Sequence, residues 1–93
     1  MMRLQELEEG RDTLKSKSVQ LWSAHDVSRY VQSLQRDFGE KASMYADTMV
    51  REDISGSVLL KLEDKDLKEL GFSLGHRKVM LLHISAASKN LFF

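Results

Sequence analysis

Three histidines, His25, His76 and His83, are the side chains best suited to acid–base or metal chemistry. None has another histidine four residues on, and the chain has no cysteine. His76 and His83 are seven residues apart, too far along one helix to hold the same ion. We therefore expect no metal site. We expect His25 to be an exposed first-turn residue, and His76 to pack on Leu74 or Trp22 at a helix start.

Motifs for nucleophilic catalysis and phosphate binding are also missing. No serine lies in a GxSxG context, and neither Gly71 nor Gly75 belongs to a strand-led, lysine-ending phosphate loop. Asp64 and Asp66 could form a paired-carboxylate site, but lysines interleave with them, which is typical of a solvated helix face. The sequence predicts no enzyme: we expect no catalytic residue, no cofactor and no small-molecule substrate.

The totals indicate one small helical domain, with or without an appendage. The chain has 93 residues, no proline and five glycines, so long helices are permitted. Fourteen basic and fourteen acidic residues balance, which argues against a general nucleic-acid binder. No apolar run approaches the roughly 20 residues of a membrane span, and nothing at the N-terminus resembles a signal peptide. We expect a cytoplasmic protein, with the nucleus as the alternative, and no membrane partner.

Residues 1–20 are predicted to be an extension ahead of the domain. Leu7, Leu14 and Leu21 are seven residues apart and Leu4 precedes Leu7 by three, an incomplete coiled-coil pattern. Three interpretations stay open: a frayed helix or linker, the end of an upstream coiled coil, or a helix over residues 3–18 that docks on the domain.

Five helices are predicted within residues 21–90. Ser23 is an N-cap candidate with Asp26 three residues on, so the first helix is expected over residues 24–35, with Trp22 folding back onto the core. The next four helices are expected over residues 40–51, over 56–61, through EDKDLKEL, and over about 75–90. A connection is expected at residues 36–42. The inner side of the second helix should carry Met44, Tyr45, Thr48 and Met49.

The last helix carries more apolar residues than one core-facing stripe requires. The stripe expected to face the core consists of Met80, Ile84, Ala87 and Leu91. A second stripe, displaced around the axis, consists of Val79, Leu82 and Ala86. Because a surface helix normally has one apolar face, we expect the N-terminal segment or a partner chain to cover Val79 and Leu82.

Read in order, these features resemble the sterile alpha motif (SAM) domain over residues 21–90. The matching features are Trp22, the turn with Ile54 and Gly56, the segment with Leu59, Leu60 and Leu62, the DLKELG helix at 66–71, and Gly75, His76 and Arg77. The resemblance implies an all-α, five-helix bundle with a long C-terminal helix, followed here by a tail at residues 91–93. The leucine-spaced lead is similar to that of signalling proteins, including kinases, in which a coiled coil precedes a SAM domain.

The resemblance also implies two docking surfaces. The end-helix surface consists of Leu74, Gly75, His76, Arg77 and Lys78. The mid-loop surface consists of Glu52, Asp53, Glu63, Asp64, Asp66 and Glu69. In the SAM family the end-helix of one molecule docks on the mid-loop of another, a heterologous contact that forms open chains or pairs. The implied function is homo- or hetero-association with another SAM domain within a larger signalling or scaffold protein, with Leu74 as the central apolar contact and Val79 and Leu82 as an extra apolar interface.

A second function follows from the same resemblance, since some SAM domains bind RNA hairpins. Arg77 and Lys78 would then contact phosphates, with Lys61, Lys65 or Lys68 as further contacts. The zero net charge and the acidic neighbours of each lysine cluster argue against this alternative. Lipid binding through the apolar last helix is a third, weaker alternative.

Overall fold

The computed structural model describes residues 18–89, and its regular elements in that range are all helical. They are the 3-10 turn η1 (Val19–Leu21) and the helices α2 (Ala24–Gln32), α3 (Gln35–Phe38), α4 (Lys41–Arg51), α5 (Gly56–Leu59), α6 (Asp64–Glu69) and α7 (Leu74–Lys89). The predicted all-α bundle with a long C-terminal helix is confirmed. The predictions for the N-terminal extension up to residue 17, including a helix over 3–18, and for the tail at 91–93 lie outside the described residues.

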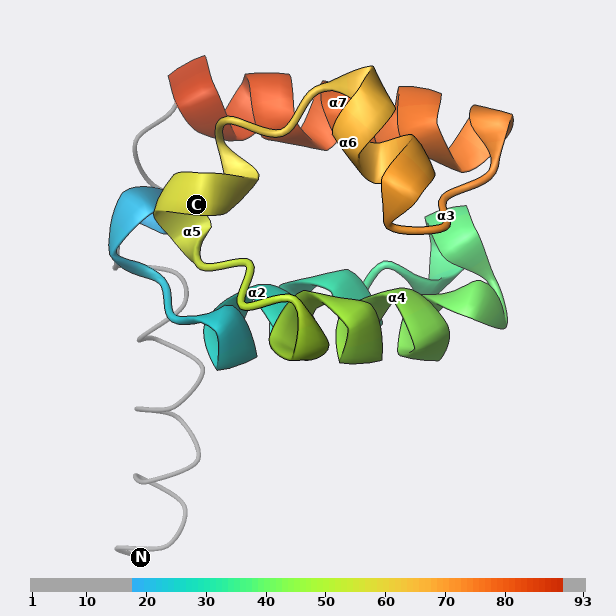
Figure 1. Ribbon diagram of the computed structural model, residues 1–93, viewed down its shortest axis with the longest axis horizontal. Helices are drawn as coiled ribbons and strands as arrows, with labels where there is room; N and C mark the ends of the chain where they lie inside the picture. The colour runs from blue at the N-terminus through green and yellow to red at the C-terminus, as the bar shows by residue number, and fades with distance from the viewer. Residues whose placement is uncertain (1–17, 90–93) are drawn as a thin grey trace, which may run out of the picture.

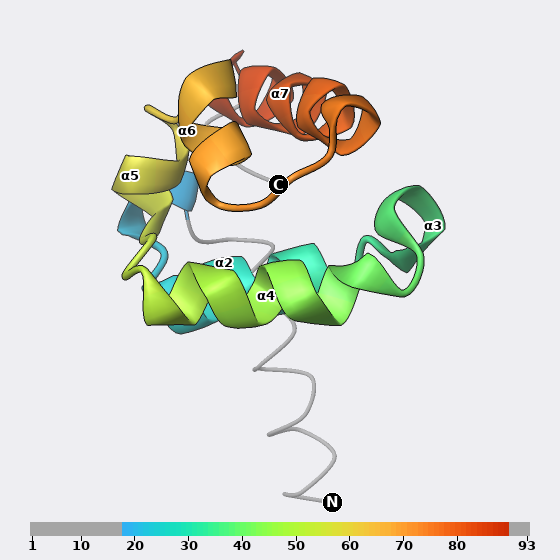
Figure 2. The ribbon, with the colours of Figure 1, turned by 45° about the vertical axis from the view of Figure 1, so that its right-hand side comes forward.

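The helices form two layers around a single core (Figures 1 and 2). The lower layer is α2 beside α4, the most extensive helix pair, and the upper layer is α6 with α7. At one end of the molecule α5 packs on η1, and at the other end α3 lies beside the beginning of α7. The largest side chains that are fully buried in this core are Tyr45, Met49, Leu59, Leu67, Met80, Val19, Val27 and Val31.

The beginning of α2 is fixed by the predicted cap. The Ser23 hydroxyl accepts from the Asp26 amide at 3.1 Å, and the Ser23 amide donates to the Asp26 carboxylate at 3.0 Å. Two otherwise unpaired amides are thereby satisfied. Asp26 also pairs with Arg29 at 2.6 Å, so this buried carboxylate is well compensated. Trp22, just ahead of the cap, is buried and its ring packs at 5.4 Å from that of Tyr30, which confirms its predicted core role.

Gly56 is required by the close approach of α5 to η1. Its amide donates to the Trp22 carbonyl at 2.9 Å. A Cβ at this position would lie only 1.7 Å from the Val19 carbonyl oxygen. Any side chain would therefore push α5 away from the turn that holds Val19 and Trp22 in the core.

Two helices, α6 and α4, each end in a left-handed turn of the same type. After α6, Gly71 has φ +96°, and the Phe72 amide reaches back to the Leu67 carbonyl at 3.0 Å. After α4, Asp53 has φ +55°, and the Ile54 amide donates to the Met49 carbonyl at 2.8 Å. In both turns the six-to-one hydrogen bond satisfies a carbonyl of the last helical turn and aims the next apolar residue at the core. The predicted left-handed role of Gly71 is confirmed.

The connection between the first two long helices differs from the prediction. The helix expected over 24–35 ends at Gln32, where the Ser33 hydroxyl donates back to the Tyr30 carbonyl at 2.6 Å. The chain then forms α3 inside the expected connection at 36–42. Phe38 stabilises this short helix because its buried ring packs edge-on against Tyr45 at 5.2 Å.

The inner face of α4 is mostly as predicted. Tyr45, Thr48 and Met49 are buried, but Met44 is 50% exposed, so its expected place in the core was wrong. Met44 lies on the solvent edge of the helix, one turn before Thr48, whose hydroxyl donates to the Met44 carbonyl at 3.0 Å.

The long helix α7 begins one residue earlier than predicted, at Leu74. The Arg77 amide donates to the Ser73 carbonyl at 2.8 Å, which makes Ser73 the capping residue. Met80, Ile84 and Ala87 are buried as expected, whereas Leu91 lies outside the described residues. The residues of the second apolar stripe differ in burial: Val79 packs partly against the core, whereas Leu82 is 71% exposed.

Candidate protein-docking surfaces

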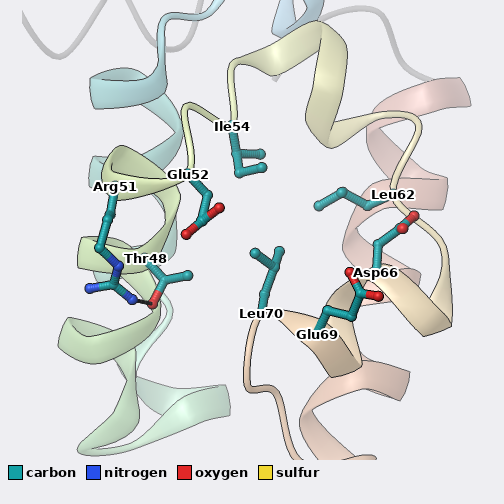
Figure 3. Close-up of a pocket in the computed structure, with 8 residues that line it drawn as sticks. All are labelled: Thr48, Arg51, Glu52, Ile54, Leu62, Asp66, Glu69 and Leu70. Carbon is teal, nitrogen blue, oxygen red and sulfur yellow. Dashed lines mark hydrogen bonds between the residues drawn. The ribbon is translucent and has the colours of Figure 1, made fainter.

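A groove lies between the end of α4 and the face of α6 (Figure 3). Its volume is about 310 Å³. The side chains of Ile54, Leu62 and Leu70 point toward one another and form an apolar floor. A groove of this size admits one or two side chains of a partner, and its apolar floor favours the binding of an aliphatic side chain.

Three carboxylates of the predicted mid-loop surface line this groove. Glu52 approaches from the end of α4, and Asp66 and Glu69 from α6 (Figure 3). Among residues 18–89, none of the three has a cationic side chain within ion-pair distance. The single cation of the lining, Arg51, donates to the Thr48 hydroxyl at 3.1 Å. The groove thus carries more negative than positive charge and favours a cationic side chain of a binding partner.

The remaining acidic residues of the mid-loop surface do not join the groove. Asp64 accepts from the Arg77 guanidinium at 2.9 Å. Glu63 lies 3.8 Å from Lys65, and both side chains are largely exposed, so this pair contributes little. Asp53 occupies the left-handed turn that ends α4. The structure thus brings together three of the six predicted mid-loop residues.

The end-helix surface likewise contains some residues that are exposed and others that are engaged within the molecule. Leu74 is 62% exposed, Gly75 is exposed, and nothing lies within 4 Å of a Cβ built on Gly75. Lys78 is exposed and makes no ion pair with any described residue. Together, Leu74, Gly75 and Lys78 present an aliphatic group, bare backbone and a free ammonium group. No feature of the fold requires a glycine at position 75, so its lack of a side chain leaves room for a partner.

Arg77 and His76 are engaged inside the molecule. The Arg77 guanidinium, 13% exposed, donates to the Asp64 carboxylate and to the Phe72 carbonyl, each at 2.9 Å. Arg77 therefore ties α7 to α6. His76 was predicted to pack on Leu74 or Trp22, and the contacts that the structure shows for its ring are with Tyr45 and Phe38. Its Nδ1 lies 2.6 Å from the Tyr45 hydroxyl, and its ring packs edge-on to Phe38 at 5.2 Å.

The sequence did not identify Ile54, Leu62 and Leu70 as groove residues because each fits an ordinary core position. A usable signal was present in their spacing. Leu70 follows Asp66 by four residues, so one face of α6 and its C-cap carries an acidic and an apolar group together, whereas Leu62 lies ahead of the extended N-cap residue Glu63.

Neither a metal-ligand cluster nor a membrane-spanning helix occurs among the described residues. Nowhere between residues 18 and 89 do three His, Asp or Glu side chains gather as metal ligands would. Within the same range, none of the helices combines the length and apolar content needed to cross a bilayer. His25 is exposed, as expected.

Comparison with known proteins identifies the class of domain to which this bundle belongs. Residues 19–87 match the SAM domain (sterile alpha motif) family. The chain belongs to the SAM family, whose members are generally protein-interaction modules.

The relatives it resembles are much longer proteins. Mouse diacylglycerol kinase delta is 37% identical over 73 residues, which is 77% of this chain and 6% of the kinase. Mouse diacylglycerol kinase eta is 36% identical over 76 residues, or 81% of this chain and 6% of that protein. Diacylglycerol kinase eta of Drosophila melanogaster is 36% identical over 70 residues, or 74% of this chain and 3% of that protein. The similarity is confined to the SAM region, which is itself non-catalytic, so it does not transfer kinase activity to this chain.

Proposed function

We propose that this SAM domain associates head to tail with a second copy of itself, as an assembly element of a larger protein. Leu74, Gly75 and Lys78 at the start of α7 would enter the acidic groove of the neighbouring copy. One observation carries the proposal: a single chain offers an apolar groove with three carboxylates that lack ion-pair partners among the described residues, and also an exposed leucine beside an unpaired lysine.

The two surfaces are opposite in charge, and one exposes an aliphatic side chain where the other has an apolar floor. Leu74 can bury its aliphatic group against the floor formed by Ile54, Leu62 and Leu70, where apolar contact contributes roughly 25 cal/mol per Å² of buried surface. Lys78 can approach Glu52 and Glu69 at the rim. The apolar contact supplies affinity, and the opposite charges speed the encounter and fix its orientation. Because the two surfaces differ, the contact does not close on itself, and further copies can add.

Paired charge-reversal variants of the full chain provide the test. Lys78→Glu removes the cation of the end-helix surface and leaves the groove intact, whereas Glu69→Lys alters the groove and leaves the end-helix surface intact. We expect sedimentation equilibrium to show a mass that rises with concentration for the wild type. Each variant alone should remain monomeric. An equimolar mixture of the two variants should form a dimer and nothing larger, since only one competent surface of each kind remains.

Lys89→Glu is the matched control, because it reverses an exposed lysine at the far end of the same helix. It should associate as the wild type does. A wild type that stays monomeric at the highest soluble concentration, with no dimer in the variant mixture, would overturn self-association. Equal weakening by Lys89→Glu and Lys78→Glu would show that general charge, rather than the end-helix surface, drives the contact.

The RNA-hairpin alternative gains no support from the placement of its residues. Of the two proposed phosphate contacts, Arg77 is bound to Asp64. Lys78 is then the one cation of that pair left to meet a phosphate. Of the lysines that could assist it, Lys61, Lys65 and Lys68, Lys65 lies 3.8 Å from the Glu63 carboxylate.

A further inference from the structure

The hydrogen bond between His76 and Tyr45 satisfies a buried hydroxyl group in one of its two directions. The Ser73 amide points at the Tyr45 hydroxyl oxygen from 3.5 Å, and Nδ1 of His76 lies 2.6 Å from the same oxygen. The amide can only donate, so it cannot take up the buried proton of the hydroxyl. Among the described residues, Nδ1 of His76 is the acceptor within hydrogen-bond distance of that proton, so a hydroxyl that donates to Nδ1 leaves no buried group unpaired. In this arrangement His76 carries its own proton on Nε2.

The ring contacts of His76 among the described residues are aromatic, and its next neighbours along α7 are cationic. Tyr45 has no exposed surface, and its ring stacks on Phe72 with centroids 3.8 Å apart. The contact from α3 is the uncharged Phe38 ring. From α4 the titratable contact is Tyr45 itself, and along α7 the next two residues are Arg77 and Lys78. No carboxylate in residues 18–89 lies within ion-pair distance of His76. The positive end of the α7 dipole is also here.

His83, two turns along α7, provides an internal contrast. Its Nδ1 lies 3.0 Å from the Tyr30 hydroxyl of α2, and its Nε2 lies 2.8 Å from the Asp37 carboxylate of α3. His83 therefore has a tyrosine hydroxyl at Nδ1, as His76 does, and in addition a carboxylate at Nε2. His76 has no such anionic partner among the described residues.

We propose that the His76–Tyr45 hydrogen bond is a pH-sensitive latch that holds the first turn of α7 against α3 and α4. A second proton on His76 turns Nδ1 into a donor and leaves the buried hydroxyl proton of Tyr45 without its acceptor. It also places a cation at the positive end of α7, beside Arg77 and Lys78. Acidification therefore loosens the first turn of α7, while the middle of the helix keeps its hold through His83 and Asp37.

Protection of backbone amides against hydrogen exchange, measured on the full chain at pH 7.5 and pH 5.5, tests the latch. For the amides of residues 77–80, normalised for intrinsic exchange, we expect roughly tenfold lower protection at the acid pH, the effect of leaving one buried polar group unpaired. Amides in the middle of α2 and α4 should change much less. Direct ¹⁵N measurement should also show Nδ1 of His76 as an acceptor at pH 7.5.

His76→Gln is the decisive variant, because an amide oxygen can accept from Tyr45 and does not titrate in this range. It should keep protection at both pH values. His83→Gln and His25→Gln should lose protection on acidification as the wild type does. If protection in the wild type does not change with pH, or falls equally in His76→Gln, the latch is wrong. An Nδ1–H tautomer of His76 at pH 7.5 would contradict it independently.

The latch bears on docking only through the proposed function, because the turn it holds carries Leu74 and Lys78. Hydrogen exchange reports on a single molecule, so a failure of self-association would leave the latch result intact. If both proposals hold, the association measured by sedimentation should weaken between pH 7.5 and pH 5.5 in the wild type and not in His76→Gln.

Discussion

The Arg77 guanidinium lies 2.9 Å from the Asp64 carboxylate, so a cation of the predicted end-helix surface is bound to an anion of the predicted mid-loop surface within one molecule. A second bond, to the Phe72 carbonyl, anchors the guanidinium across the α6–α7 turn. Arg77 thus joins the two surfaces and is not itself free for a partner. The two adjacent basic residues therefore have different roles. Lys78 is available for docking, and Arg77 maintains the angle between α6 and α7.

Replacing Arg77 should therefore lower the stability of the single molecule. Arg77→Gln removes a mostly buried donor group and leaves the Phe72 carbonyl and Asp64 without it, at a cost of about 1–3 kcal/mol in the free energy of unfolding. Asp64→Asn should cost less, because half of that side chain faces solvent. Urea denaturation of both single variants and the double variant measures the coupling, which we expect at about 0.5–1 kcal/mol. Additive single effects would show that the two side chains act independently.

Gly56→Ala should be among the most damaging small substitutions in the described chain. The added methyl group would lie 1.7 Å from the Val19 carbonyl oxygen and 2.9 Å from Cβ of Trp22, so η1 and α5 must separate. We expect a loss of several kcal/mol, on the order of the larger core defects, or no cooperative thermal transition. Calorimetry measures the change. A variant that melts with the wild type would mean that η1 moves away at little cost.

Gly75→Ala is the matched opposite case. Space is open around a Cβ at this position, and alanine favours helix by up to about 1 kcal/mol over glycine, so the isolated domain should melt at the same temperature or higher. If the bare backbone of Gly75 approaches a second copy, the same substitution should weaken self-association. Stability and association would then move in opposite directions. An unchanged association constant would remove Gly75 from the docking surface.

Tyr30 should make the domain sensitive to alkali. Burial, and secondarily the Asp37 carboxylate, raise the pKa of the Tyr30 hydroxyl above its ordinary value of 10.0. The folded state therefore favours the neutral hydroxyl, and the resulting stabilisation is complete below pH 10 and lost as the pH rises through the folded pKa. In Tyr30→Phe, the free energy of unfolding should fall less steeply above pH 10 than in the wild type. Denaturation series at pH 9, 10 and 11 compare the slopes, and equal slopes would contradict the prediction.

Local pattern predicted most of the helices because caps and glycines mark their ends. Ser23 with Asp26, and Gly71 before Phe72, act within a few residues of the backbone groups they satisfy. The helix α3 escaped prediction because its four residues carry one apolar side chain, and its stability comes from Phe38 packing on Tyr45, Phe72 and His76. Those contacts depend on the tertiary fold and have no local periodicity.

The docking surfaces were predictable in composition but not in the role of each residue. Sequence spacing identifies the acidic stretch and the basic helix start. It does not show that Asp64 and Arg77, thirteen residues apart, neutralise each other. Nor does it show that Tyr45, thirty-one residues before His76, is hydrogen-bonded to the imidazole. Such pairings follow from how the α6–α7 turn sits over α4.

The link between Asp64 and Arg77 has a geometric consequence for any assembly. It fixes α6, which helps form the groove, at a set angle to the start of α7, which would enter the next groove. Each added copy would then be rotated and shifted by the same amount, so a row of copies would follow a screw axis whose pitch is set inside one domain. A variant that loosens this link should change the pitch of such a filament before it changes the strength of a single contact.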